Sequence, residues 1–149
     1  MKRFVLGEYS RFRSECHKVK VGNKDSIEMT AHLLSKYICE NDVLVPMPSH
    51  YGYATYTKDI ATIISQLRGC PVEDCLKCVP HNTLYQTKKN GQDLSLEMFS
   101  LYVPSGNLIL IDNVIDTGLT MDSAISAMGV ECGFAVIGIT TNSNYIKNI

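Results

Sequence analysis

Continuous apolar runs alternate along this chain with stretches whose apolar residues recur at helical spacing. The helical stretches are Ser26–Cys39, Tyr56–Leu67 and Leu119–Met128. The apolar runs, which predict strands, are Asp42–Pro48, Leu108–Asn113 and Phe134–Thr140, and the more mixed Val72–Val79 is predicted to be a further strand. Strands that alternate with helices at these lengths predict an α/β fold, with a doubly wound, mainly parallel sheet flanked by helices.

The beginning of the chain has a mixed pattern. Phe4, Leu6 and Tyr9, with Val5, predict an edge strand, and the alternation in His17–Val21 predicts a second strand. Asp25 followed by Glu28 predicts a capping box at the start of the next helix. We expect residues 1–24 to form an edge-strand segment or, together with the C-terminal tail, a small hood over the site.

Length and composition narrow the class of protein. The 149 residues suit one domain, and we find no internal repeat or linker within 1–149. A net charge of −1 gives no general attraction to nucleic acid or membrane surfaces. No run of 18 apolar residues predicts a membrane span, and the N-terminal apolar run is too short for a signal peptide. We therefore expect a cytoplasmic protein that binds a small molecule.

Six cysteines leave a metal site open as an alternative. Cys70, Cys75 and Cys78 have the spacing of three iron–sulfur ligands, with Cys132 as a distant fourth. In a strand, however, Cys75 and Cys78 would point to opposite faces. Reduced thiols, several of which fill the core, are the favoured interpretation, and the role of Cys70, Cys75 and Cys78 stays open.

The most informative stretch is Leu108–Gly129, in which a buried strand ends at the acid Asp112 and a polar turn leads into a helix. Backbone N–H groups and the positive end of the helix dipole converge at such a helix start. Thr117 and Thr120 add hydroxyl donors. A phosphate beside a carboxylate suits a sugar phosphate. We expect a side chain at Gly118 to block ligand binding while leaving the fold intact, since the loop would lie outside the core.

Leu108–Thr120 closely resembles the signature of type I phosphoribosyltransferases that binds phosphoribosyl pyrophosphate (PRPP). The shared pattern is four hydrophobic residues, two acids, two hydrophobic residues, and a loop ending in Thr-Gly-x-Thr; Asn113 replaces the second acid. The resemblance implies the type I phosphoribosyltransferase fold. It also implies that Asp112, beside Asn113, binds the ribose hydroxyls. The 5′-phosphate would lie on the loop Asp116, Thr117, Gly118, Leu119 and Thr120.

A series of motifs over residues 43–140 has the order seen in ComF-like competence proteins: Val45–His50, Gly52-Tyr53, Thr83 with Gln86, Met98-Phe99 and then the PRPP signature. The chain thus resembles that family, but it lacks the N-terminal zinc module common among its members. This resemblance implies that Met47–Tyr51 is the pyrophosphate loop, with Ser49, His50 and Tyr51 at the ligand. It implies that Asn82–Asp93 is the catalytic loop, with Lys88 reaching pyrophosphate. A solvated histidine and a solvated lysine are the alternatives for His50 and Lys88.

The resemblance implies a Mg²⁺-dependent transfer of phosphoribosyl to an unidentified acceptor, with release of pyrophosphate. Asp112 would contact the Mg²⁺ indirectly, since this ion commonly uses one or two carboxylates plus substrate phosphates. Asp116 resembles the aspartate that handles a purine proton in hypoxanthine–guanine transferases; a helix N-cap is the alternative. Asn113 keeps open a non-catalytic protein that senses PRPP or a nucleotide. Homodimers are common for this fold.

Overall fold

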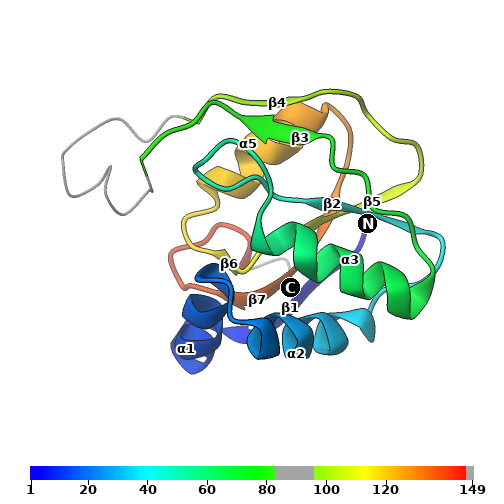
Figure 1. Ribbon diagram of the computed structural model, residues 1–149. Coiled ribbons are helices and arrows are strands. Elements are labelled where there is room, and N and C mark those ends of the chain that lie inside the picture. The colour runs from blue at the N-terminus through cyan, green and yellow to red at the C-terminus, as the bar shows by residue number, and fades with distance from the viewer. Residues whose placement is uncertain (83–95, 147–149) are drawn as a thin grey trace.

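A five-stranded parallel sheet forms the centre of the structure, a computed structural model that describes residues 1–82 and 96–146 (Figure 1). Its strands lie in the order β1 (Arg3–Glu8), β7 (Gly133–Ile139), β5 (Asn107–Ile111) and β2 (Asp42–Pro46), and β6 (Val114–Ile115) also pairs with β7. Every neighbouring pair is parallel. The carboxyl ends of the strands therefore meet at one edge, as the sequence predicts.

The dipeptide between β5 and β6 stays bound to the sheet. The Asp112 N–H donates to Ala135 O at 3.3 Å, and Asn113 O accepts the N–H groups of Ile137 and Gly138 at 3.0 and 3.1 Å. These backbone bonds hold Asp112 and Asn113 at the sheet edge rather than in a free loop.

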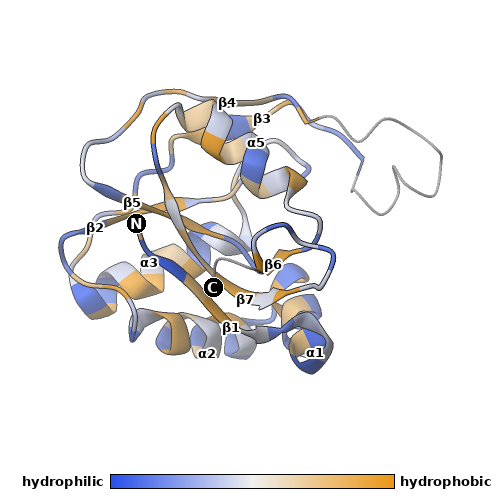
Figure 2. Cartoon of the chain, turned by 180° about the vertical axis from the view of Figure 1, so that it is seen from behind, coloured by the Kyte–Doolittle hydropathy of each residue, from blue (hydrophilic) through white to orange (hydrophobic). Residues whose placement is uncertain are grey.

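Two layers cover the sheet. One face carries α1 (Tyr9–Lys20), α2 (Lys24–Ser35) and α3 (Tyr56–Arg68). The other carries α5 (Leu119–Met128) and an antiparallel ribbon of β3 (Leu76–Cys78) and β4 (Met98–Ser100). Figure 2 shows the hydrophobic residues concentrated along the central strands. Helices on both faces of a mainly parallel sheet confirm the predicted fold class.

Alternation along β5 divides its side chains between the two layers. Leu108 and Leu110 pack against α5 and the ribbon, whereas Ile109 and Ile111 pack against α1, α2 and α3. All four side chains are fully buried. Since both faces are covered, the strand is a continuous apolar run in the sequence rather than an alternating one.

The predicted strand at His17–Val21 is wrong, because these residues end α1 and its capping turn. A strand would have placed His17, Val19 and Val21 on one face, but Val21 is exposed. The buried residues are Cys16 and Val19, three apart, which is helical spacing. The expected edge strand is β1 over Phe4–Leu6, but Tyr9, predicted to belong to it, begins α1 instead.

Two further boundaries differ from the prediction. Asn23, not Asp25, caps α2, since its side chain accepts the Ser26 N–H at 3.0 Å, and α2 ends at Ser35. The segment 72–79 forms no strand of the main sheet: only Leu76–Cys78 is a strand, and it belongs to the ribbon. Beside β2 this segment makes one isolated bridge, Leu44 to Val72, before it turns away.

The cysteines of the described chain are all free thiols. Cys70 lies in the layer of α1, α2 and α3, while Cys75 and Cys132 lie in the opposite layer. The sheet separates the residues that a shared cluster would need, which favours the interpretation as core thiols. Across 1–82 and 96–146, no helix is long and apolar enough to cross a membrane.

Candidate functional site

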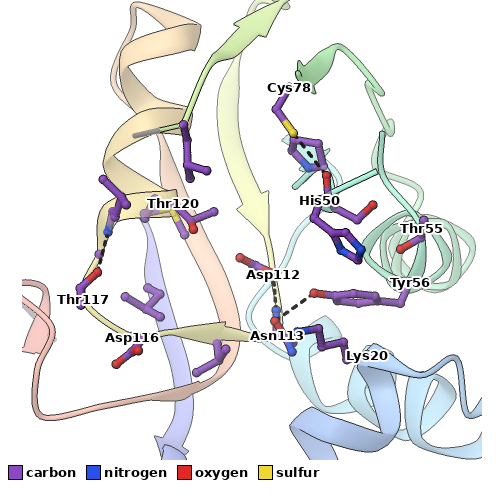
Figure 3. Close-up of a pocket in the computed structure, with 18 of the residues that line it drawn as sticks. Lys20, His50, Thr55, Tyr56, Cys78, Asp112, Asn113, Asp116, Thr117 and Thr120 are labelled. Atoms are coloured by element: carbon purple, nitrogen blue, oxygen red, sulfur yellow. Dashed lines mark hydrogen bonds between the residues drawn. The ribbon is translucent and has the colours of Figure 1, made fainter. Parts of the chain in front are cut away.

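A pocket of about 850 Å³ opens at the carboxyl edge of the sheet (Figure 3). It is lined by residues that follow β1, β2, β5 and β7, and by residues of α1, α3 and the ribbon. Ten of the residues predicted for the site line it together: Ser49, His50, Tyr51, Asp112, Asn113, Asp116, Thr117, Gly118, Leu119 and Thr120. Lys88, with most of the predicted catalytic loop Asn82–Asp93, lies outside the described residues.

Asp112 lies in the middle of the pocket, between Thr117 and Thr120 on one side and His50 on the other (Figure 3). Its Oδ1 accepts the N–H of Asn113 at 2.8 Å. Burial raises the pKa of this carboxyl to about 7, against the opposing effects of that hydrogen bond and of the Lys20 charge. Asp112 can therefore gain or lose a proton near neutral pH.

Asn113 points the other way, into the layer of α1 and α3. Its Nδ2 donates to the Cys16 carbonyl at 3.3 Å, and its Oδ1 accepts the Tyr56 hydroxyl at 3.1 Å. The side chain thus joins the end of β5 to two helices. An aspartate cannot donate to a carbonyl, and it would place a second carboxylate beside buried Asp112. This network explains in physical terms why an amide occupies the position.

The loop after β6 leads directly into α5. Gly118 is the N-cap of α5 and no side chain caps the helix, so the alternative interpretation of Asp116 as the N-cap is wrong. Asp116 Oδ1 instead accepts the Thr140 hydroxyl at 2.9 Å. Thr117 Oγ1 accepts the Leu119 N–H at 3.3 Å. The start of α5, with its positive dipole end, faces the same pocket as Asp112.

Gly118 has a φ of +99°, a backbone conformation that glycine adopts at little cost. It is buried, and a Cβ there would overlap Asn144 Oδ1 and lie 3.1 Å from the Tyr145 ring. The expectation that this loop lies outside the core is therefore wrong. Gly118→Val would strain the backbone and force the Asn144 side chain and the Tyr145 ring to shift, so it is not a selective test of ligand binding.

The loop Met47–Tyr53 is held by its own hydrogen bonds. The N–H and hydroxyl of Ser49 donate to Tyr53 O at 2.8 and 2.9 Å, and the Tyr51 N–H donates to Ser49 Oγ at 3.2 Å. The predicted Ser49 donors are thus used inside the loop. The His50 ring lies 4.1 Å from that of Tyr51, and burial, followed by the charges of Lys20 and His81, lowers the pKa of His50.

Lys20 and Tyr56 are among the pocket-lining residues that the sequence did not predict. Lys20 extends from the end of α1, and its charge acts on both Asp112 and His50. Tyr56 begins α3, and burial raises its pKa well above the usual value. The signal for Lys20 was its spacing of three residues from His17, which places both on one helix face and in the pocket. Because His17–Val21 was predicted to be a strand, this helical spacing was not recognised.

The described residues contain no group of three or more His, Cys, Asp or Glu that could hold a metal ion. A protein-only metal cage is therefore not built into this part of the chain. One carboxylate, Asp112, in a pocket large enough for a phosphorylated sugar fits a Mg²⁺ whose other ligands are substrate phosphates and water.

No known family model and no curated protein matches the chain. Among solved structures, an allosteric regulatory enzyme of purine biosynthesis aligns with 74% of this chain at 14% identity and a TM-score of 0.50; the chain covers 25% of that protein. The purine phosphoribosyltransferase of Pyrococcus horikoshii Ot3 (16% identity, 97% of this chain, 82% of that one) has a TM-score of 0.48. The orotate phosphoribosyltransferase of Aeropyrum pernix (14% identity, 83% of this chain, 64% of that one) has a TM-score of 0.47.

At such identities the first likeness shows the fold alone, and the other two TM-scores lie below 0.5. The shared architecture is the mainly parallel sheet flanked by helices described above. It agrees with the α/β class, a mainly parallel sheet flanked by helices, that the sequence predicts.

Replacing Asn113 with Asp tests the amide network. We expect Asn113→Asp to lower the free energy of unfolding by about 1–3 kcal/mol near neutral pH, because the Cys16 carbonyl loses its donor and a second carboxylate is buried. Urea denaturation measures the change. Asn23→Asp is the matched control: its Oδ1 only accepts a hydrogen bond, so a carboxylate serves equally well there. Equal stability of Asn113→Asp and the parent would contradict the network.

The raised pKa of Asp112 makes stability depend on pH. The folded protein keeps this proton up to about pH 7, whereas the unfolded chain loses it near the ordinary value of 3.8. Stability of the parent should therefore fall as pH rises between those values. We expect Asp112→Asn to lack this fall and to be more stable than the parent at about pH 8, by an amount on the order of a few kcal/mol. Denaturation across pH measures it.

The exposed substitution Glu40→Gln is the control for Asp112→Asn and should follow the parent. If the stability difference between Asp112→Asn and the parent were the same at about pH 4 and about pH 8, the assignment of a raised pKa to Asp112 would be wrong.

Proposed function

We propose that the pocket binds PRPP or another ligand that contains ribose 5-phosphate. The observation that carries this proposal is the convergence of Asp112 and the loop Asp116–Thr120 on one pocket at the carboxyl edge of the sheet. A carboxylate accepts hydrogen bonds from two neighbouring sugar hydroxyls. The start of α5 provides backbone N–H donors and a positive dipole end for a phosphate.

In this proposal the 5′-phosphate lies at Thr117–Thr120 and the ribose hydroxyls bind Asp112. Hydroxyl donors stabilise the ionised carboxylate and would lower the raised pKa of Asp112 on binding. Affinity should therefore improve as pH rises toward about 8. The pyrophosphate extends toward His50 and Lys20, which lie on the other side of Asp112 (Figure 3). A bound anion favours the protonated form of His50.

The first candidate function is a phosphoribosyltransferase with an unidentified acceptor. Bond formation at ribose C1′ would release pyrophosphate, and Lys20 together with Lys88 would stabilise the negative charge that develops there. Mg²⁺, held by the pyrophosphate and contacted indirectly by Asp112, would neutralise part of that charge when bound. Asp116 is the proposed base for an acceptor proton, with its carboxylate held by Thr140.

The second candidate is a non-catalytic protein that binds PRPP or a nucleotide. Two observations favour it: Asn113 is used to join β5 to α1 and α3, and the Ser49 donors are used within their own loop. Because the Ser49 donors already form hydrogen bonds within the predicted pyrophosphate loop, they are not free to stabilise a departing pyrophosphate. The pocket also offers one carboxylate, Asp112, where the family signature has two acids. Tight binding without turnover is the property that distinguishes this candidate from the first.

We further propose that the protein is a ComF-like member of the phosphoribosyltransferases, that it requires Mg²⁺, and that it acts in the cytoplasm. We propose a small-molecule partner rather than nucleic acid, because the net charge of −1 gives no electrostatic footprint for a polyanion. A homodimer is also proposed.

Calorimetry with PRPP and with ribose 5-phosphate, in the presence of Mg²⁺, tests the proposal. We expect the parent to bind both and Thr120→Ala to bind both more weakly. The loss of a hydrogen bond to a charged ligand costs about 1.5–3 kcal/mol, or roughly ten- to a hundred-fold in Kd. Thr62→Ala, on the exposed side of α3, is the matched control and should bind like the parent.

Pyrophosphate release with a panel of bases and amines then separates the two candidates. Release above background supports the transferase, whereas binding without release supports the sensor. A parent protein that binds neither ligand, or a Thr120→Ala variant that binds both as tightly as the parent, would contradict the proposed site.

A further inference from the structure

The chain that follows β7 contacts both ends of the loop that leads into α5. At the start of that loop, the Thr140 hydroxyl donates to Asp116 Oδ1 at 2.9 Å and to Asp116 O at 3.2 Å. At the far end, the Tyr145 hydroxyl donates to Asp122 Oδ1, in the first turn of α5. The six residues Thr140–Tyr145 of the C-terminal segment thus span the whole loop.

The middle of the loop packs against the same segment. Gly118 lies so close to Asn144 and Tyr145 that a Cβ would overlap the first and touch the ring of the second. Its positive φ allows this close approach. The backbone of the loop therefore has a surface directly behind it, on the side away from the pocket. Of the described residues after Ile139, only Thr140 lines the pocket itself.

Tyr145 is fixed in the core, so the contact with the loop is rigid. Its ring is buried and packs edge-to-face on Phe134 of β7, with 5.5 Å between ring centroids. The Arg3 guanidinium of β1 lies 5.4 Å from the centre of the Tyr145 ring. The Tyr145 N–H donates to Ser143 Oγ at 3.0 Å, which fixes the turn before it. The loop is thereby connected through Tyr145 to the neighbouring strands β7 and β1.

We propose that Thr140–Tyr145 holds the loop Asp116–Asp122 in its binding conformation, and that Tyr145 is a positioning residue acting through Asp122 and Gly118. This inference rests on the proposed function, because the loop is the proposed phosphate site. A loop that is already ordered spares the ligand the free-energy cost of ordering it, so affinity depends on a side chain that does not line the pocket.

Tyr145→Phe tests the inference, because it removes the hydroxyl and keeps the ring that packs on Phe134. Tyr102→Phe is the matched control: Tyr102 also donates to a carboxylate, Glu73 Oε2 at 2.5 Å, but it lies outside the pocket. Two measurements are made on each protein. Calorimetry gives the Kd for ribose 5-phosphate, and hydrogen exchange of the ligand-free protein gives the opening of the loop amides.

We expect Tyr145→Phe to raise the Kd roughly tenfold and to speed exchange of the Thr117–Thr120 amides by a similar factor, with exchange in β5 and β2 unchanged. Tyr102→Phe should change neither. Asp122→Ala should behave like Tyr145→Phe, and the double variant should be no worse than either, because both remove the same hydrogen bond.

The inference would be overturned if Tyr145→Phe left both the hydrogen exchange of the Thr117–Thr120 amides and the Kd for ribose 5-phosphate unchanged. It would also be overturned if Tyr102→Phe had effects as large as those of Tyr145→Phe. Additive effects in the double variant would also overturn it. Failure of the parent to bind ribose 5-phosphate contradicts the proposed function instead. In that case the exchange rates alone still decide whether Tyr145 positions the loop.

Discussion

Parallel pairing of the strands is the constraint on which the rest of this structure depends. Because β1, β7, β5 and β2 all run in one direction, the residues after each strand meet at a single edge. Alternation along β5 then decides the direction of each side chain. Asp112 continues the face of Leu110 and lines the pocket with α5, whereas Asn113 continues the face of Ile111 and joins α1 and α3.

The two neighbouring residues Asp112 and Asn113 therefore have opposite physical roles. The amide of Asn113 satisfies one donor and one acceptor in a buried place, which a carboxylate could not do. The carboxyl of Asp112 is buried with few compensating donors, so its pKa is raised to about 7. A site that keeps such a group reduces its own stability near neutral pH, and a ligand that donates hydroxyl hydrogen bonds to Asp112 would recover part of that loss.

The features that the sequence predicted are those that depend on local pattern. The strand Leu108–Ile111, the turn at Gly118 and the start of α5 are consecutive in the chain, so their grouping follows from the order of residues. The features that it missed depend on contacts between distant segments. Lys20 reaches the pocket only because His17–Lys20 belongs to a helix, and Tyr145 reaches the loop only because β7 lies beside β5 and β6. The hydrogen bond from Ser49 to the Tyr53 carbonyl depends on the path of the loop between them, and residue spacing alone does not predict that path.

A crystal structure of the protein soaked with PRPP and Mg²⁺ tests the central claim most directly. We expect a 5′-phosphate on the N–H groups of Thr117–Thr120 and ribose hydroxyls within hydrogen-bond distance of Asp112. We expect the pyrophosphate on the side of His50 and Lys20. A ligand that binds elsewhere on the surface, or one that enters the pocket with its phosphate away from the start of α5, would contradict this claim.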